Sequence, residues 1–136
     1  MNLESKARYL LDTSAFMTFL EDEKGADEVE FILRSGKVLC PFVVLLEIYY
    51  ITLRERGQEI ADKRYAVIRN LNVEFINNID EPTLITAGRF KGKFRISLAD
   101  AIIAAYAKIN DAILVHKDPE YECLKKEVSQ YKLPYK

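Results

Sequence analysis

Four acidic residues stand in apolar surroundings of this sequence, where a carboxylate is unusual. Asp12 interrupts RYLLDTSAFMTFL, Glu47 lies within PFVVLLEIYYITL, Asp100 lies within SLADAIIAAYA, and Asp118 follows ILVHK. Carboxylates that lie close together raise one another's pKa, and at neutral pH such a cluster is stable only when a cation neutralises it. Oxygen ligands alone favour Mg²⁺ or Mn²⁺, and the matching chemistry is phosphodiester hydrolysis.

The positions of these acids depend on the elements that carry them. Short apolar segments of strand type alternate with longer helix-like segments, which indicates an α/β fold. We predict strands at Arg8–Leu11, Lys37–Cys40, Val73–Ile76 and Ala112–His116, with a weak fifth near the C-terminus. We predict helices near Thr13–Glu21, Asp27–Ser35, Phe42–Arg56, Glu59–Asn70, Glu81–Lys91, Leu98–Asn110 and Glu120–Val128. The strand segments show little polar alternation, as expected for a parallel sheet that is covered on both faces.

This arrangement predicts that the acids converge. Asp12 follows the first predicted strand and Asp118 follows the fourth, so both emerge at the carboxyl edge of a parallel sheet. Open α/β sheets bind their ligands at that edge. Glu47 and Asp100 lie on helices that are otherwise apolar. We therefore expect the four carboxylates to meet at one edge of the sheet and to share one or two hydrated ions.

Three of the acids also have a purely structural interpretation. Asp12 and Asp118 could each act as an N-cap, since plausible helices start directly after them. Ser97 and Asp100 have the spacing of a capping box, in an acidic variant. For each residue taken singly, the cap and the functional interpretation both stay open.

Glu47 is harder to explain as a structural residue. Arg54 and Arg56 lie too far along its own helix to neutralise it, so it requires a distant partner or a metal ion. Four independent accidents would otherwise be needed to explain four acids at such positions. Their conjunction favours a shared metal site.

Length and composition restrict the class of protein. The chain has 136 residues, a formal charge of −1 and a pI near 5.9, so it is not a generally basic protein and any polyanion must be bound locally. Cys40 and Cys123 form no CxxC pair and His116 is the single histidine, which excludes an ordinary structural zinc site. The N-terminus lacks a secretion-signal pattern, and Pro41 and Glu47 interrupt the longest apolar run. We expect a soluble cytoplasmic protein with no membrane contact.

The series LLDTSAF, the apolar helix around Glu47, SLADAIIAAYA and ILVHKDPEY resembles the PIN-domain nucleases, particularly the small VapC-type toxins. The resemblance runs from about Tyr9 to Tyr121 in the order and spacing of that family. It implies one PIN-like domain over residues 1–136, with 1–7 as a short tail. It also implies a three-layer α/β/α sandwich with a central parallel sheet of four to five strands, in which the first strand neighbours the one leading to Asp118.

The same resemblance implies a function and partners. It implies a metal-dependent endoribonuclease that uses one or two Mg²⁺ or Mn²⁺ ions and serves as the toxin of a toxin-antitoxin pair. As catalytic and metal-binding residues it implies Asp12, Glu47, Asp100 and Asp118. As supporting polar residues it indicates Thr13, Ser14 and Ser97. Small members of the family usually form homodimers and are inhibited by an antitoxin protein, so we expect both partners and an RNA substrate.

One position departs from the family pattern. Where a Thr or Ser commonly stands two residues before the last acid, this chain has His116. Its ring could form hydrogen bonds, bind the metal or obstruct the site, and a strand-end histidine bonded to the backbone is the simpler interpretation. A non-catalytic PIN-like scaffold regulated by a protein partner is therefore the alternative function.

The segment RFKGKFR indicates a contact with RNA. It spaces four cations around two phenylalanines just upstream of Asp100: Arg89, Lys91, Lys93 and Arg95 around Phe90 and Phe94. Cations could bind phosphates while an aromatic ring stacks on a base. The alternative is an ordinary solvated loop whose phenylalanines face the core.

Two other enzyme classes fit less well. A phosphotransferase of the haloacid-dehalogenase type would need an acid where Ser14 stands. A structure-specific DNA nuclease shares the acidic architecture, but at this length there is little room for elements that clamp a duplex.

Overall fold

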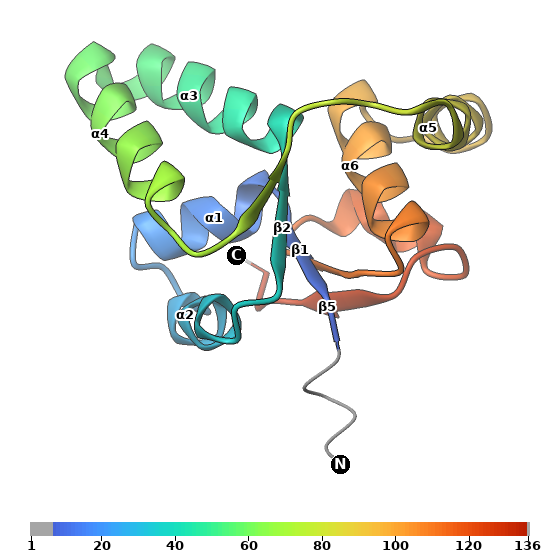
Figure 1. The fold of residues 1–136 in the computed structure, drawn as a ribbon, viewed down its shortest axis with the longest axis horizontal. Coiled ribbons are helices and arrows are strands. Elements are labelled where there is room, and N and C mark those ends of the chain that lie inside the picture. Colours follow the sequence, from blue (N-terminus) through green and yellow to red (C-terminus); the bar gives the residue numbers. More distant parts are fainter. Residues whose placement is uncertain (1–6, 136) are drawn as a thin grey trace.

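The computed structural model describes residues 7–135, and within them the chain forms one five-stranded parallel sheet (Figure 1). The strands are β1 (Tyr9–Leu11), β2 (Val38–Pro41), β3 (Glu74–Ile76), β4 (Ile113–His116) and β5 (Gln130–Lys132). Their order across the sheet is β3-β2-β1-β4-β5, and every neighbouring pair is parallel. The predicted central parallel sheet is confirmed, including the weak fifth strand and the adjacency of β1 to β4. Residues 1–6 of the predicted tail lie outside the described residues.

Helices cover both faces of this sheet. They are α1 (Thr13–Leu20), α2 (Ala26–Arg34), α3 (Phe42–Arg56), α4 (Gln58–Arg69), α5 (Glu81–Lys93), α6 (Leu98–Ile109) and the short 3₁₀ helix η2 (Pro119–Leu124). Figure 1 shows α1 and α2 on one side of the strands, with the α3–α4 pair extending beyond them, and α5 and α6 on the other side. The predicted three-layer α/β/α architecture is therefore confirmed.

The predicted helix at Glu120–Val128 is wrong. The chain instead forms the 3₁₀ helix η2, which ends at Leu124. In such a helix, side chains three residues apart lie above one another. This spacing lets Tyr121 and Leu124 both enter the core, where each is fully buried. Because β5 begins at Gln130, only a short turn separates the two elements.

The core lies between the sheet and its two helical layers. All four residues of β2 are buried, as expected for a strand that is covered on both faces. Large buried side chains come from both layers, with Phe16 of α1 on one side and Phe90 and Tyr106 of α5 and α6 on the other. Packing of these side chains fixes the helices relative to the strands and so determines where the acidic residues point.

Helix α3 is apolar on more than its core-facing side. Val44 and Ile48 are buried, whereas Leu46, Tyr50 and Leu53 are 56%, 39% and 42% exposed. A helix that exposes apolar side chains at this spacing has an uncovered face. The near-continuous apolar pattern around Glu47 therefore comes from two apolar faces of α3. One face packs against the core, and the other is exposed.

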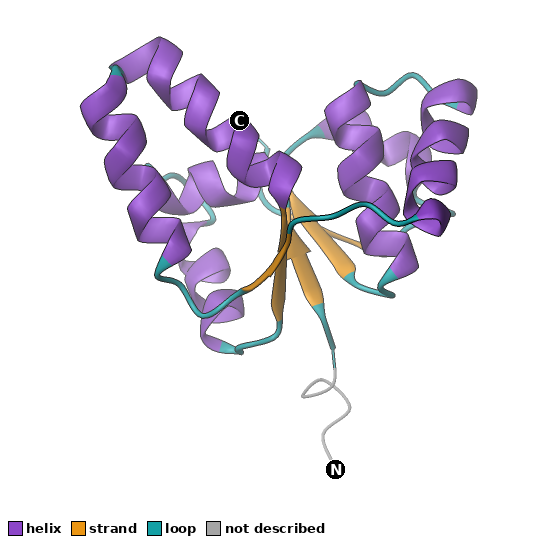
Figure 2. Cartoon of the chain, turned by 45° about the horizontal axis from the view of Figure 1, so that its top comes forward, coloured by secondary structure: helices purple, strands orange, loops and turns teal. Residues whose placement is uncertain are grey.

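The carboxyl ends of the strands point to one region of the molecule. Figure 2 shows them directed towards the space between the α3–α4 pair and the α5–α6 pair. Asp12 and the segment 117–118 directly follow β1 and β4, which pair in register from Tyr9 with Ile113 to Leu11 with Val115. Within residues 7–135, no helix is long and apolar enough to cross a membrane.

Candidate metal centre

Asp12 is both a helix cap and a buried carboxylate at the edge of the sheet. It is the N-cap of α1, and its Oδ1 accepts hydrogen bonds from Ala15 N at 2.9 Å and Ser14 Oγ at 2.7 Å. Only 2% of the residue is exposed. Burial raises the pKa of Asp12 to about 7, although the bonds from Ser14 and Ala15 lower it and the charge of Asp118 raises it further. The cap interpretation is correct, but it leaves a carboxylate that is costly to ionise.

Asp100 lies in the first turn of α6 and is also buried. Its Oδ1 accepts a hydrogen bond of 3.0 Å from the hydroxyl of Tyr121. Burial is the main cause that raises the pKa of Asp100 to about 8, and the nearby charges of Asp12, Asp118 and Glu120 act in the same direction. Asp100 is therefore electrostatically linked to the acids that follow β1 and β4.

The capping box predicted at Ser97 is formed only in part. Ser97 is the N-cap of α6, and its Oγ accepts a bond of 3.1 Å from Asp100 N. The reciprocal bond is made by a different residue, because Ser97 N donates to the carboxylate of Glu120. The carboxylate of Asp100 is thus directed to Tyr121 and the acidic cluster instead of to its own helix end.

Asp100, Asp118 and Glu120 form the closest group of acids. One carboxylate oxygen of each lies within 4.8 Å of those of the other two. Asp118 Oδ1 also accepts a hydrogen bond of 2.9 Å from Glu120 N, so Asp118 caps η2, one of the two interpretations that the sequence left open. None of the salt bridges found within residues 7–135 involves Asp12 or any of these three acids.

Glu47 lies at the margin of this group. It is half-buried on α3, and its Oε1 accepts a hydrogen bond of 2.6 Å from the hydroxyl of Thr13. Thr13 directly follows Asp12, so the bond brings Glu47 to the start of α1. The partner that Glu47 requires is therefore the hydroxyl of Thr13. Glu47 is not one of the three acids whose oxygens lie closest together.

Ser14 joins the two segments that carry the strand-end acids. Its Oγ donates to Asp12 and accepts a hydrogen bond of 2.9 Å from Lys117 N, the residue before Asp118. A single hydroxyl thus fixes Asp12 relative to the chain that leaves β4. The predicted supporting position of Ser14 has a clear geometric basis.

His116 is fully buried, and both of its ring nitrogens have partners. Nδ1 accepts a hydrogen bond of 3.0 Å from Asp118 N, so the proton lies on Nε2, which donates to Gln130 Oε1 at 2.8 Å. Burial lowers the pKa of His116, which keeps the ring neutral. The structure matches the simpler interpretation, a strand-end histidine bonded to the backbone. The ring positions Asp118 and is not available as a ligand.

Two residues of the cluster were not selected from the sequence. Glu120 and Tyr121 lie on η2, where Glu120 adds a carboxylate and Tyr121 bonds Asp100. The run DPEY places an acid two residues after Asp118, which is a signal that could have indicated Glu120. The contact of Tyr121 depends on the 3₁₀ geometry and had no comparable signal.

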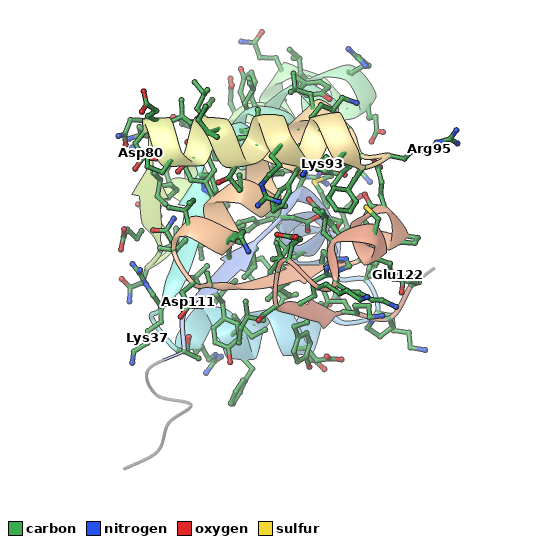
Figure 3. The ribbon with its side chains drawn as sticks, turned by 90° about the vertical axis from the view of Figure 1, so that its right-hand side faces the viewer. Lys37, Asp80, Lys93, Arg95, Asp111 and Glu122 are labelled. Atoms are coloured by element: carbon green, nitrogen blue, oxygen red, sulfur yellow. The ribbon has the colours of Figure 1, made fainter. Side chains whose placement is uncertain are left out.

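The four cations of RFKGKFR differ in the contacts that they make within the protein. Arg89 pairs with Glu127 at 3.3 Å, and Lys91 Nζ donates to Ile96 O at 2.8 Å. Lys93 and Arg95 are exposed, and Figure 3 shows both at the C-terminal end of α5, on the side of the molecule where Glu122 of η2 lies. Lys93 and Arg95 are thus the two candidates that remain for phosphate contacts.

The expected stacking of a base on this segment is not supported at Phe90. Phe90 is fully buried, and Phe94 is half-buried with its ring centroid 6.3 Å from that of Phe90 in an edge-to-face arrangement. Both phenylalanines face the core, as in the alternative interpretation of the segment.

The residues present fit a hard divalent cation. The donors are carboxylate oxygens only, which suits Mg²⁺ or Mn²⁺ and not zinc or copper. Asp12 and Asp100 resist ionisation because burial removes water from them, and a bound cation would stabilise their charged forms at neutral pH. Asp12, Asp100, Asp118 and Glu120 are the residues that would hold it.

We expect the change Glu120→Gln to weaken Mn²⁺ binding about tenfold or more, because it removes one negative charge from the closest group of acids. The glutamine oxygen can still accept the bond from Ser97 N. Glu122→Gln is the matched control, since Glu122 lies on the same 3₁₀ helix but pairs with Lys132 at 2.9 Å. Isothermal titration calorimetry measures both dissociation constants, and equal values would place Glu120 outside the reach of the ion.

Comparison with known proteins assigns the class of the fold and site. The sequence matches the PIN domain family over residues 9–126, so the chain belongs to the PIN domain family. The resemblance noted in the sequence is thereby confirmed. No curated protein matches the sequence.

Solved structures with a similar fold include toxin-antitoxin proteins. A structure of VapBC2 from Rickettsia felis, bound to a DNA fragment from its promoter, matches with a TM-score of 0.76 and 15% identity, covering 93% of this chain and 98% of that one. DNA-bound VapBC from Salmonella typhimurium gives 0.73 and 18%, with 93% and 98% coverage. VapC20 of Mycobacterium tuberculosis, a Sarcin-Ricin loop cleaving toxin, gives 0.69 and 15%, with 85% and 93% coverage. At these identities the similarity shows the fold.

Proposed function

We propose that this protein is a metal-dependent endoribonuclease and the toxin of a toxin-antitoxin pair. The observation that carries the proposal is the group of close carboxylates from Asp100, Asp118 and Glu120, next to buried Asp12, at the carboxyl edge of a PIN fold. Within residues 7–135 none of these acids has a salt bridge, and burial together with the neighbouring acids raises the pKa of Asp12 and Asp100, so such a cluster is costly unless it serves to bind an ion.

The chain's own residues hold the acids in place for this role. Ser14 orients Asp12, Tyr121 orients Asp100, and the ring of His116 fixes the backbone of Asp118. A divalent cation supplies polarisation of the phosphoryl group, a lower pKa for an attacking water and stabilisation of the leaving oxygen. Burial of Asp12 and Asp100 removes water from these two carboxylates, which strengthens their charge interactions.

His116 no longer supports the alternative function of a non-catalytic scaffold. That alternative rested on His116, which could have obstructed the metal site. In the structure its ring is buried and engaged with Asp118 N and Gln130, away from any ligand position. The scaffold becomes the outcome that the activity test below would favour if no cleavage is found.

Two uncovered apolar surfaces support protein partners. The face of α3 formed by Leu46, Tyr50 and Leu53 is exposed and lies beside Glu47, so an antitoxin segment bound there would also lie next to Glu47, at the margin of the acidic site. On α5, Leu84 and Ile85 are 53% and 62% exposed and could take a second copy of the chain in a homodimer. Structures titled as VapBC and toxin-antitoxin complexes are among those with a similar fold. A toxin that cleaves cellular RNA would act in the cytoplasm, which is the location that we propose.

The test of this function is cleavage of an end-labelled single-stranded RNA by the purified protein. We expect cleavage with Mg²⁺ or Mn²⁺ and none after chelation, and we expect Asp118→Asn to remove the activity. Equal cleavage in the presence and absence of chelator would exclude the metal mechanism. A folded protein that cleaves no RNA with either ion would favour the scaffold.

Replacing Lys93 and Arg95 together with alanine should weaken RNA binding and reduce its dependence on salt. Each lost phosphate contact removes roughly 0.7 from the slope of log affinity against log salt for a single strand, so the double change should remove about 1.4. Cleavage at saturating RNA should survive. The control is Lys37→Ala with Lys63→Ala, since Figure 3 shows Lys37 far from Lys93 and Arg95. A slope equal to that of the control would exclude these contacts.

A further inference from the structure

A pocket of about 310 Å³ opens directly beside the acidic cluster. Ser14, Met17 and Glu21, from α1 and its C-terminal end, line it. The other residues of its wall are Glu23, Lys117, Pro119 and Tyr135. Figure 1 shows the C-terminal end of the chain next to α1, which is how Tyr135 reaches this position.

Ser14 and Pro119 line the pocket, and each is a direct neighbour of an acid of the cluster. Ser14 is hydrogen-bonded to Asp12, and Pro119 directly follows Asp118. A group bound in the pocket therefore lies next to whatever is bound at the acids. The volume is at the lower end of the range for small-ligand sites and suits one planar ring system.

The charges in the pocket wall are already balanced by the protein. Arg56 and Arg64 both approach the same oxygen of Glu21, Oε2, at 3.2 and 3.8 Å. Glu23, which also lines the pocket, lies 3.7 Å from Lys117 Nζ. The negative charges of Glu21 and Glu23 are thus neutralised by protein cations, and their carboxylates can accept hydrogen bonds without a further cation. This favours a neutral ligand that donates N–H groups over a metal ion or a basic side chain.

Tyr135 gives the pocket an aromatic wall. It is 38% exposed, and its ring centroid lies 6.4 Å from that of fully buried His116, with 34° between the planes. Packing against a buried ring holds Tyr135 in place. An exposed, fixed aromatic ring beside a phosphate-binding site is a common means of holding an unstacked base.

We propose that this pocket binds the base of the nucleotide adjacent to the scissile phosphate and prefers guanine. Tyr135 stacks on the base, and Glu21 accepts hydrogen bonds from its Watson–Crick edge. Guanine carries two adjacent donors there, N1–H and the N2 amine, whereas uracil carries one. Because Arg56 donates to Oε2 of Glu21, Oε1 is the main acceptor for these donors. The proposal rests on the proposed RNA cleavage for its biological meaning, but base binding itself needs no metal.

The test measures binding in EDTA, where cleavage is absent. Fluorescence anisotropy with labelled GUGUGU and UUUUUU at one salt concentration should show a preference for the guanine-containing hexamer of about fivefold or more. Glu21→Gln and Tyr135→Ala should remove the preference, and Tyr135→Phe, which keeps the ring, should retain it. Glu30→Gln and Tyr131→Ala are the controls, since Glu30 pairs with Arg34 on the surface of α2 and Tyr131 is exposed to a similar degree, 40%.

The outcomes separate this inference from the proposed function. Loss of the preference in Glu21→Gln and Tyr135→Ala, but in neither control, supports the pocket whether or not Mn²⁺ later permits cleavage. No preference in the unmutated protein, or a preference that survives both changes, overturns the pocket even if cleavage with Mn²⁺ is found. Circular dichroism of each variant confirms that the comparison is made between folded proteins.

Discussion

Replacing Asp12 with asparagine is expected to lower the rate of metal-dependent RNA cleavage by at least about 10³-fold while leaving the fold intact. Loss of a ligand to a Lewis-acid cation removes several kcal/mol of transition-state stabilisation, and each ~1.4 kcal/mol is a factor of ten. The asparagine oxygen can still accept the bonds from Ser14 and Ala15, so the cap of α1 is kept. RNA binding should be unchanged or tighter, because a negative charge beside the phosphates is gone.

The matched control for this change is Asp111→Asn. Asp111 is exposed and precedes β4, whereas Asp118 follows β4. The change Asp111→Asn therefore removes the same charge at the opposite edge of the sheet. Single-turnover cleavage at saturating RNA separates the chemical step from binding. Full activity in Asp12→Asn would reduce Asp12 to a helix cap.

The second large effect is on stability. Because burial raises the pKa of Asp12 to about 7 and of Asp100 to about 8, from 3.8 in the unfolded chain, the metal-free folded state binds more protons between those values. Its stability should therefore fall as pH rises from about 4 to 8 and then become level. Each pKa unit corresponds to about 1.4 kcal/mol, so the loss should be at least several kcal/mol, or a decrease of about 10 °C or more in Tm.

Mn²⁺ at pH 8 should reverse this loss, because it binds the ionised cluster of the folded state and finds no such cluster in the unfolded chain. Asp100→Asn should flatten the pH dependence of the metal-free protein and reduce the gain from Mn²⁺. Differential scanning calorimetry in chelator and in Mn²⁺ provides both curves. A Tm that does not change with pH or with Mn²⁺ would show that the acids are not coupled to a metal site.

Much of the sheet and its acidic edge could be predicted from the sequence. The order of short apolar segments and helices fixes which residues follow strands, and parallel pairing of β1 with β4 then brings Asp12 near Asp118. The position of Asp100 followed from an acid in the first turn of an otherwise apolar helix. These inferences depend on local pattern and on general rules for parallel sheets, and both are present in one sequence.

The features that could not be predicted from the sequence depend on tertiary contacts. Glu120 and Tyr121 enter the site because η2 is a 3₁₀ helix, and that choice is made by burial of Tyr121 and Leu124 and by the nearby start of β5. Glu47 was expected in a fully apolar setting, but the sequence could not show that one apolar face of α3 is left uncovered. Lys91 contacts Ile96 O for a similar reason, since only the fold brings the two together.

The most direct test of the metal centre is anomalous diffraction at the manganese edge from crystals of the protein grown with Mn²⁺. The structure predicts one or two anomalous peaks among the carboxylates of Asp12, Asp100, Asp118 and Glu120, and none there in crystals of Asp100→Asn. Full-occupancy peaks only elsewhere on the molecule, or no peak at all at a Mn²⁺ concentration that supports cleavage, would contradict the assignment of this cluster as the catalytic metal site.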